Sequence, residues 1–430
     1  LEDAETRESA ALVPERAWSA GEVVRYEGRH LGVSWTLLVE PAETGSVRIT
    51  GKLSDERDRC LRVEVQSPLD LPEWVWHDDF RTRRRLAEAD GALSNTAPSP
   101  FGERSMYPFG VVSRDETLLL VETDPSEPRV FRTLARKDGA LLCIQYDLAL
   151  TSQTSNFPGL ATFRCEFRSL AARDADPFRV ALADFQRRHP GFRMGRRGGV
   201  GPANLVRIEP WVQFVEMPAG MARTTANVEL LTRLGLMQHG REAELAAATL
   251  LGACLRPNGT PAVSYEEGPA ANGAQVPVNV DPDTRCAPEL PVSRAMAEWR
   301  FVREQLENPE VSGFLLGRME ESADYRGAAL GVADFPCVFE PRVLKPCVAN
   351  SFSGWEFASR VNRALVDKGK QLAGTRADDP SAFHAQLLDA VFETLPWIKS
   401  GEWNPGEQRR LVARRVIAGA KPVTWVFEAP

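Results

Sequence analysis

The chain has 430 residues, of which 43% are hydrophobic and 26% are charged. These fractions are ordinary for a globular protein, and the length is twice or more that of a usual domain, so two domains are expected. The formal net charge of -7 argues against a nucleic-acid partner. No apolar run approaches the ~20 residues of a membrane-spanning helix, so no membrane partner is expected.

Residues 1–195 are predicted to form an antiparallel β-sandwich with a terminal helix. Short segments of alternating polarity follow one another, with Gly, Pro and Asp at the breaks, which is typical of sheets with one solvated face. The helix is predicted from Asp176 to Pro190, because Pro177 stands in its first turn and Phe178 and Phe185 share a face. The predicted strands include 23–26, 33–39, 46–50, 61–65, 117–122, 130–133, 141–148 and 161–167.

The cysteines and histidines indicate no metal site and no other cofactor. Seven cysteines show no close ligand spacing, and the five histidines nowhere recur at such spacing, although a site made only of carboxylates stays open. Cys143 and Cys165 lie in apolar runs and are predicted to be buried thiols. Cys337 and Cys347 could form a disulfide across a loop. The basic cluster 81–85 lies among acids and is predicted to be a solvated loop.

The glycine-rich segment 195–201 is predicted to link the sandwich to a second domain, residues 202–430. In that domain strands and helices alternate at the spacing of a parallel sheet, either open or closed into a (β/α) barrel. Seven strands are predicted, one short of a complete eight-stranded barrel unless a strand is missed. The strands are 205–215, 249–255, 274–280, 311–316, 371–374, 388–392 and 422–427; the helices are 227–239, 242–248, 292–307, 353–368 and 406–418.

The segment 387–397 carries two carboxylates, Asp389 and Glu393, followed by Trp397. In a strand, Asp389, Val391 and Glu393 share one face. An ionised carboxylate is costly to bury unless it is paired, so Glu393 is predicted to lie at the open, carboxyl end of the strand. An acid at a strand end beside an aromatic residue suits a sugar-cleaving site. The alternative is a surface acid that opens a loop.

Seven short stretches in chain order carry a resemblance to a known family: 107–109, 128–132, 161–163, 209–211, 354–357, 369–372 and Leu388-Asp389 with Glu393. Together they resemble a group of bacterial glycoside-hydrolase-like proteins in which a β-sandwich precedes a TIM-like (β/α)8 barrel. The resemblance spans the chain from about residue 100 to the C-terminus. It implies hydrolysis of a carbohydrate by acidic residues at the carboxyl ends of barrel strands.

One stretch departs from this family. After the fourth barrel strand the resemblance implies a Tyr-Leu-Asp element, whose carboxylate would be the second catalytic acid. Here Leu316 stands where the Asp is expected, and the next carboxylates are Glu320 and Glu321. Either Glu320 or Glu321 has taken over the role, or the protein no longer hydrolyses a sugar.

Glycosidic cleavage uses one carboxyl as proton donor and a second as nucleophile or base, about 5–5.5 Å apart in retaining enzymes and about 6.5–9.5 Å apart in inverting ones. Glu393 with Glu320 or Glu321 is therefore the predicted catalytic pair. An inactive carbohydrate-binding or assembly protein is the first alternative, and an unrelated activity on an α/β scaffold is the second. The substrate-binding residues are predicted to be Glu209, Trp211, Asn279, Asn350, Asp389 and Trp397.

The predicted partner is a carbohydrate substrate, and the oligomeric state stays open, with a homodimer as one option. The start Leu1-Glu2-Asp3 is not a signal peptide, and a removed leader or a cloning junction would leave such a start. The polysaccharide interpretation predicts a periplasmic or extracellular protein, while a cytoplasmic location stays open.

Overall fold

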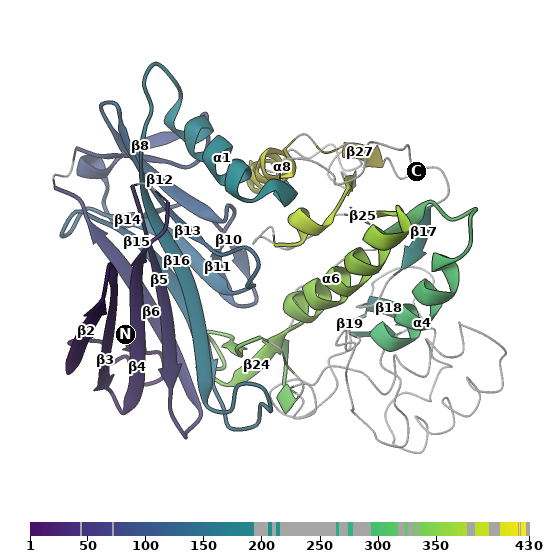
Figure 1. Cartoon of the computed structure of the whole chain (residues 1–430), viewed down its shortest axis with the longest axis horizontal. Coiled ribbons are helices and arrows are strands. Elements are labelled where there is room, and N and C mark those ends of the chain that lie inside the picture. Colours follow the sequence, from purple (N-terminus) through teal and green to yellow (C-terminus); the bar gives the residue numbers. More distant parts are fainter. Residues whose placement is uncertain are drawn as a thin grey trace.

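The computed structural model describes residues 1–43, 45–70, 73–192, 205–208, 212–215, 264–265, 274–277, 294–316, 323–325, 330–331, 333, 335–375, 383–394, 405–419, 421 and 423–426. Within these residues antiparallel sheets dominate and helices are few (Figure 1). Every strand of the two large antiparallel sheets precedes residue 172, and every strand of the parallel sheet follows residue 204. The predicted domain boundary at 195–202 lies outside the described residues and stays a prediction.

The first part of the chain forms two antiparallel sheets. The smaller has the order β1-β6-β15-β14-β9, and the larger has the order β2-β3-β4-β5-β16-β13-β12-β7-β8. All eight strands predicted for this part are confirmed. The smaller sheet contains β1 (Glu2–Asp3), β6 (Arg59–Pro68), β15 (Leu141–Leu150), β14 (Val130–Arg136) and β9 (Leu93–Ser94). The larger contains β2 (Arg16–Ala20), β3 (Val23–His30), β4 (Val33–Pro41), β5 (Ser46–Ser54), β16 (Leu160–Ala171), β13 (Thr117–Thr123), β12 (Phe109–Arg114), β7 (Val75–His77) and β8 (Arg83–Arg85); β10 (Thr96–Ser99) and β11 (Gly102–Ser105) form a separate hairpin.

A hydrophobic core fills the space between the two sheets. Trp35 and Phe163 come from the larger sheet, and Phe131 and Tyr146 from the smaller, and all four are buried in one cluster. The Tyr146 and Phe163 rings stack with centroids 5.1 Å apart. Gly51 on β5 permits this packing, because a Cβ there would lie 2.1 Å from the Phe163 ring. The alternating polarity of the strands is therefore the signature of a real sandwich core.

The predicted terminal helix is confirmed as α1 (Pro177–Arg188), and it covers the outer face of the larger sheet. Asp176 caps it by accepting a hydrogen bond from the Arg179 backbone N–H at 3.0 Å. Phe178 and Phe185 are buried against Phe109 of β12, with ring centroids 5.5 and 5.3 Å away. The apolar face read from the sequence thus fixes how the helix sits on the sheet.

A parallel sheet forms in the second part of the chain, in the order β17-β21-β25-β26-β27. Helices α4 (Arg294–Leu306) and α6 (Asn350–Lys368) supply apolar side chains to the buried cluster that also contains β21 and β25 residues. Five of the seven predicted strands contribute to this sheet, and closure into a barrel is not shown. The strands are β17 (Leu205–Ile208), β21 (Gly313–Leu316), β25 (Gln371–Thr375), β26 (Ala390–Thr394) and β27 (Val423–Val426), with α8 (Pro405–Ala418) between the last two.

Three expectations for this part need correction or lie outside the described residues. The predicted strand 205–215 is two strands, because β18 (Val212–Val215) leaves the parallel sheet and pairs antiparallel with β20 (Ala274–Pro277), which pairs with β19 (Ser264–Tyr265). Helix α6 begins at Asn350 rather than after Ser353, while Gly369 ends it with φ 64°, as predicted. The predicted segments 227–239, 242–248 and 249–255 lie outside the described residues.

The two parts are joined by direct packing. The Ala149 N–H of β15 donates to the Cys337 carbonyl at 2.8 Å. Phe383, in the short 3-10 helix η3 (Phe383–Leu387), enters the sandwich core, with its ring centroid 6.0 Å from that of Phe131. Ile417 of α8 joins the cluster around α1, which lies beside α8 in Figure 1. The small sheet β22 (Ala323–Asp324), β24 (Pro346–Ala349) and β23 (Val338–Phe339) lies at this junction.

Two further predictions fail, and one is confirmed. Cys337 and Cys347 are free thiols in different apolar clusters, so the suggested disulfide is wrong. The basic cluster is exposed as expected, but Arg83–Arg85 form edge strand β8 instead of a loop. Cys143 and Cys165 are buried free thiols, as predicted. None of the helices in the described part of the chain combines the length and apolarity that crossing a membrane requires.

Candidate functional site

The carboxyl edge of the parallel sheet is the candidate site. β26 carries Glu393, and the register pairs this residue with Trp425 on β27. Neighbouring strands lie about 4.8 Å apart, so a carboxylate position and an indole position are adjacent in one row of the sheet. The last residue of β25, Thr375, pairs with Phe392, so Glu393 comes one residue beyond the ladder between β25 and β26. Glu393 therefore lies at the open end of its strand, where ligands of parallel α/β sheets bind.

Asp389 lies at the other end of the same strand. It immediately precedes β26, and its Oδ2 accepts the backbone N–H of Leu372 at 3.0 Å, while its own N–H donates to the Leu372 carbonyl at 2.6 Å. The residue is 4% exposed. Glu393 follows it by four positions, a span of about 13 Å along a strand. Asp389 thus joins β25 to β26 at their amino ends; its predicted part in sugar binding stays a prediction.

Leu316 is the last residue of β21 and is fully buried. It belongs to a cluster with Phe314 of the same strand and with Phe357, Ala358 and Val361 of α6. A carboxylate at this position would enter an apolar layer between sheet and helix, at a cost of several kcal/mol. Leucine at this position is therefore a core residue.

The other predicted site residues are described only in part. Asn350 is the first residue of α6 and directly follows β24. Six lie outside the described residues: Glu209, Trp211, Asn279, Glu320, Glu321 and Trp397. Trp74 and Trp76 are buried in the sandwich core, and their Nε1–H groups donate to Asp70 and Asp78 at 3.0 and 2.9 Å.

Apart from the edge of the parallel sheet, a polar cavity of about 330 Å³ lies on the outer face of the larger sheet near the end of α1. Glu122 of β13 is directly opposite Glu166 of β16, and both carboxylates are nearly buried. Like charges at such a pair repel each other, and arginines neutralise them. Arg188 of α1 binds Glu122 with two nitrogens, and Arg168 binds Glu166 at 2.8 Å.

This ion-pair network extends to the surface. Arg168 and Arg187 both contact Glu43, at 3.0 and 2.7 Å. The hydrogen bond from Arg187 is the main cause that lowers the pKa of Glu43 to about 2. Sequence analysis did not find this network, because its members are far apart in the chain and only the strand register brings Glu122 beside Glu166. Since its carboxylates are bound to arginines, the network holds α1 on the sheet.

In the part of the chain that the structure describes, no group of three or more His, Cys, Asp or Glu residues is placed to hold a metal ion. No protein-family profile matches the chain. No curated protein matches it in sequence.

Several solved structures are similar to the chain at low identity. The ligand-free α-N-acetylgalactosaminidase NagBb from Bifidobacterium bifidum is 10% identical over 90% of this chain and 72% of that chain, with a TM-score of 0.39. The GalNAc complex of that enzyme is 11% identical over 94% of this chain and 76% of that chain, also with a TM-score of 0.39. A GalM/aldose epimerase homologue from C. elegans is 13% identical over 36% of this chain and 68% of that chain, with a TM-score of 0.26. At TM-scores this low, the similarities carry no conclusion about fold or function.

Proposed function

We propose that this protein is a glycoside hydrolase that cleaves a poly- or oligosaccharide at the carboxyl edge of its parallel sheet, with Glu393 as one catalytic carboxylate. The observation that carries the proposal is the register of β26 with β27, which sets Glu393 beside Trp425 at that edge. Indole rings stack on the C–H faces of sugars, and carboxylates supply the acid and base of glycosidic cleavage. One strand pair thus offers both chemistries.

Glu320 or Glu321 is proposed as the second carboxylate. β21 ends at Leu316, at the same edge of the sheet at which β26 carries Glu393, and these residues follow Leu316 in the sequence by four and five positions. β21 and β26 are separated only by β25, which puts their backbones two strand spacings, about 10 Å, apart. The proposal requires the two carboxyl groups to lie about 6.5–9.5 Å apart for an inverting enzyme, or about 5–5.5 Å apart for a retaining one.

The proposal includes closure of the parallel sheet into a (β/α) barrel and an exported location. It also keeps Glu209, Trp211, Asn279, Asn350 and Trp397 as residues around the sugar. An inactive carbohydrate-binding protein is the second candidate. The buried Leu316 favours it, because the residue that the family resemblance assigns to catalysis is an apolar core residue in this chain.

The test is hydrolysis of aryl glycosides and polysaccharides by the wild type, Glu393→Gln and a matched control, Glu304→Gln. Glu304 is an exposed acid on α4, so its substitution removes the same charge away from the edge. We expect wild-type turnover, a loss of kcat/KM of about a thousandfold in Glu393→Gln, equal to about 4 kcal/mol, and an unchanged control.

Sugar binding measured by calorimetry without turnover in any protein would establish the second candidate. If the wild type shows no turnover and no sugar binding, both candidates are refuted. Full activity of Glu393→Gln would refute the assignment of Glu393 while leaving the class of enzyme intact.

A further inference from the structure

A groove of about 650 Å³ runs along edge strand β8, between this strand, the short 3-10 helix η1 (Leu86–Glu88) and β9. It lies where the last strand of the larger sheet meets the last strand of the smaller one. Three arginines and one glutamate line it, together with the aliphatic side chains of Val75, Ala89 and Leu93. The volume is in the range of sites that bind small molecules or a segment of a chain.

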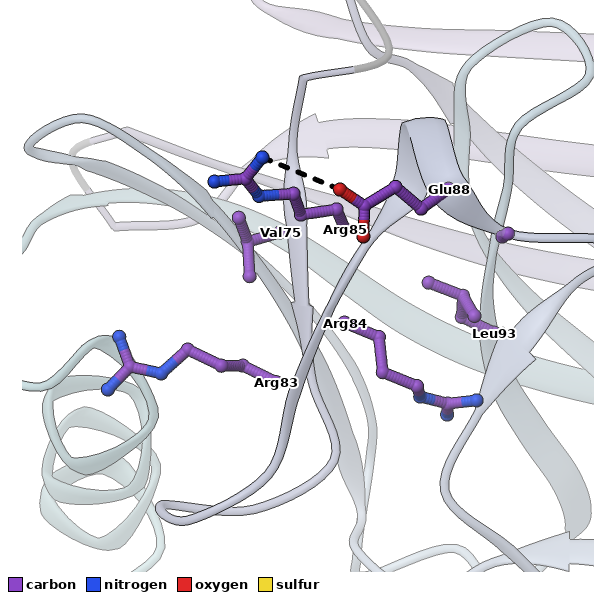
Figure 2. Close-up of a pocket in the computed structure, with 7 residues that line it drawn as sticks. Val75, Arg83, Arg84, Arg85, Glu88 and Leu93 are labelled. Carbon is purple, nitrogen blue, oxygen red and sulfur yellow. Dashed lines mark hydrogen bonds and ion pairs between the residues drawn. The ribbon is translucent and has the colours of Figure 1, made fainter.

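All three arginine side chains of the groove are exposed, and those of Arg83 and Arg85 form only weak ion pairs. The exposed fractions of the Arg83, Arg84 and Arg85 side chains are 63%, 41% and 72%. Figure 2 shows Arg83 and Arg84 extending to opposite sides of the chain, and Arg85 paired with Glu88. The Arg85–Glu88 pair is 3.4 Å long with both partners exposed, and Arg83 is 4.0 Å from its nearest acid, Asp176. Such pairs contribute little, so an incoming anion can replace them.

Arg84 is the anchored member of the three. It binds the Asp78 carboxylate, and its Nη2 donates to the Ser94 carbonyl on β9 at 2.7 Å. This hydrogen bond joins β8 of the larger sheet to β9 of the smaller sheet, the two strands that border the groove. Arg83 and Arg85, two residues apart in a strand, present guanidinium groups on one face, about 7 Å apart along the strand.

The backbone adds donors at the same edge. The Leu86 N–H donates to the Trp74 carbonyl, and the Asp78 N–H donates to the Thr82 carbonyl. In an antiparallel ladder these bonds alternate, so the amides of Arg83 and Arg85 point away from β7. β8 is the last strand of its sheet, so these amides face the open edge. The strand thus presents two guanidinium side chains on one face and two backbone N–H groups, together with the carbonyls of the same residues, along its open edge.

We propose that this groove binds an acidic polysaccharide through its carboxylate or sulfate groups. Guanidinium groups bind such planar or tetrahedral anions with paired hydrogen bonds, and the aliphatic floor suits the C–H faces of sugar rings. A nucleic acid fits less well, because none of the described residues that line the groove is an aromatic residue on which a base could stack. The proposal does not depend on catalysis at the parallel sheet.

The experiment measures binding of the full chain to polygalacturonate, dextran sulfate and uncharged dextran by calorimetry, at low and at raised salt. The test variant is Arg83→Gln with Arg85→Gln. The control is Arg16→Gln with Arg25→Gln, which removes two exposed arginines from β2 and β3 at the opposite edge of the same sheet. A further variant, Arg83→Lys with Arg85→Lys, keeps both charges and checks that the fold tolerates substitution at these two positions.

We expect salt-sensitive binding to at least one polyanion, none to dextran, and a loss of affinity of about tenfold or more in the Gln variant only. Preference for polygalacturonate would identify a carboxylate ligand, and preference for dextran sulfate a sulfate ligand. Unchanged binding in the Gln variant, an equal loss in the control, or no binding to either polyanion would overturn the proposal. Tighter binding to single-stranded DNA than to both polysaccharides would overturn the choice of ligand.

Discussion

Replacing Leu316 by Asp should unfold the protein rather than activate it. The substitution restores the residue that the family resemblance assigns to catalysis, so it separates a lost catalytic position from a core position. Leu316 is fully buried between β21 and α6. Removing its side chain costs about 1.5–3 kcal/mol of apolar burial, and placing a carboxylate in the same space costs several kcal/mol more. The sum, about 5 kcal/mol or more, equals the whole stability of many domains.

The assay is urea unfolding of Leu316→Asp between pH 4 and pH 7, with Leu316→Asn and Leu316→Met beside it. Burial raises the folded-state pKa of the new carboxyl above its unfolded value near 3.9, so the native state holds the proton over a wider pH range. The stability of Leu316→Asp should therefore fall as pH rises through this window, by about 1.4 kcal/mol per pH unit. Leu316→Asn should be destabilised without this added pH dependence, and Leu316→Met by less than about 1.5 kcal/mol.

A free energy of unfolding of Leu316→Asp within about 1 kcal/mol of the wild-type value would contradict the core position of Leu316. Such a result would mean that the side chain at this position reaches solvent. A gain of glycosidase activity in the same variant would go further, because it would identify position 316 as a catalytic position at the edge of the sheet.

Two more predictions concern the ion-pair network under α1. Glu122→Ala should destabilise the protein by about 1–3 kcal/mol in urea unfolding, because the nearly buried Arg188 loses the carboxylate that it binds with two nitrogens and keeps its ion pair with Asp184. Adding Arg188→Met should recover part of the loss, and a cost well below about 1 kcal/mol would contradict the assignment. Glu43 has its folded-state pKa lowered to about 2 from 4.5, chiefly by Arg187, so its contribution is present above pH 4.5 and is lost as pH falls toward 2. Stability measured over that interval should therefore fall more steeply in the wild type than in Glu43→Gln, and parallel curves would contradict this.

The strands of the sandwich were largely predictable because the local sequence of most of them indicates a strand. Strands such as β4 and β16 alternate between buried and more exposed residues, and the turns between strands contain Gly, Pro and Asp. Strand β12 was missed since five of its six residues are buried on both faces, which removes the alternation. Strand β8 was missed for the opposite reason: three exposed arginines give no apolar face at all.

The candidate site was predictable only one strand at a time. The sequence places Glu393 near the end of a strand, and the structure agrees for its backbone. The adjacency of Glu393 and Trp425 depends on register between strands separated by α8, which no local pattern encodes. The division of 205–215 between two sheets, and the inward packing of Leu316, likewise result from long-range pairing that propensity does not report.

Because Phe383 packs into the sandwich core, the sandwich helps to position the candidate site at the edge of the parallel sheet. Phe383 lies seven residues before the start of β26, and Leu388 and Asp389 then lead directly into that strand. The sandwich therefore positions the amino end of β26, the strand that carries Glu393 near its carboxyl end. Changes in the sandwich core beside Phe131 would reach the site through this short rigid connection, although they touch neither the parallel sheet nor any sugar.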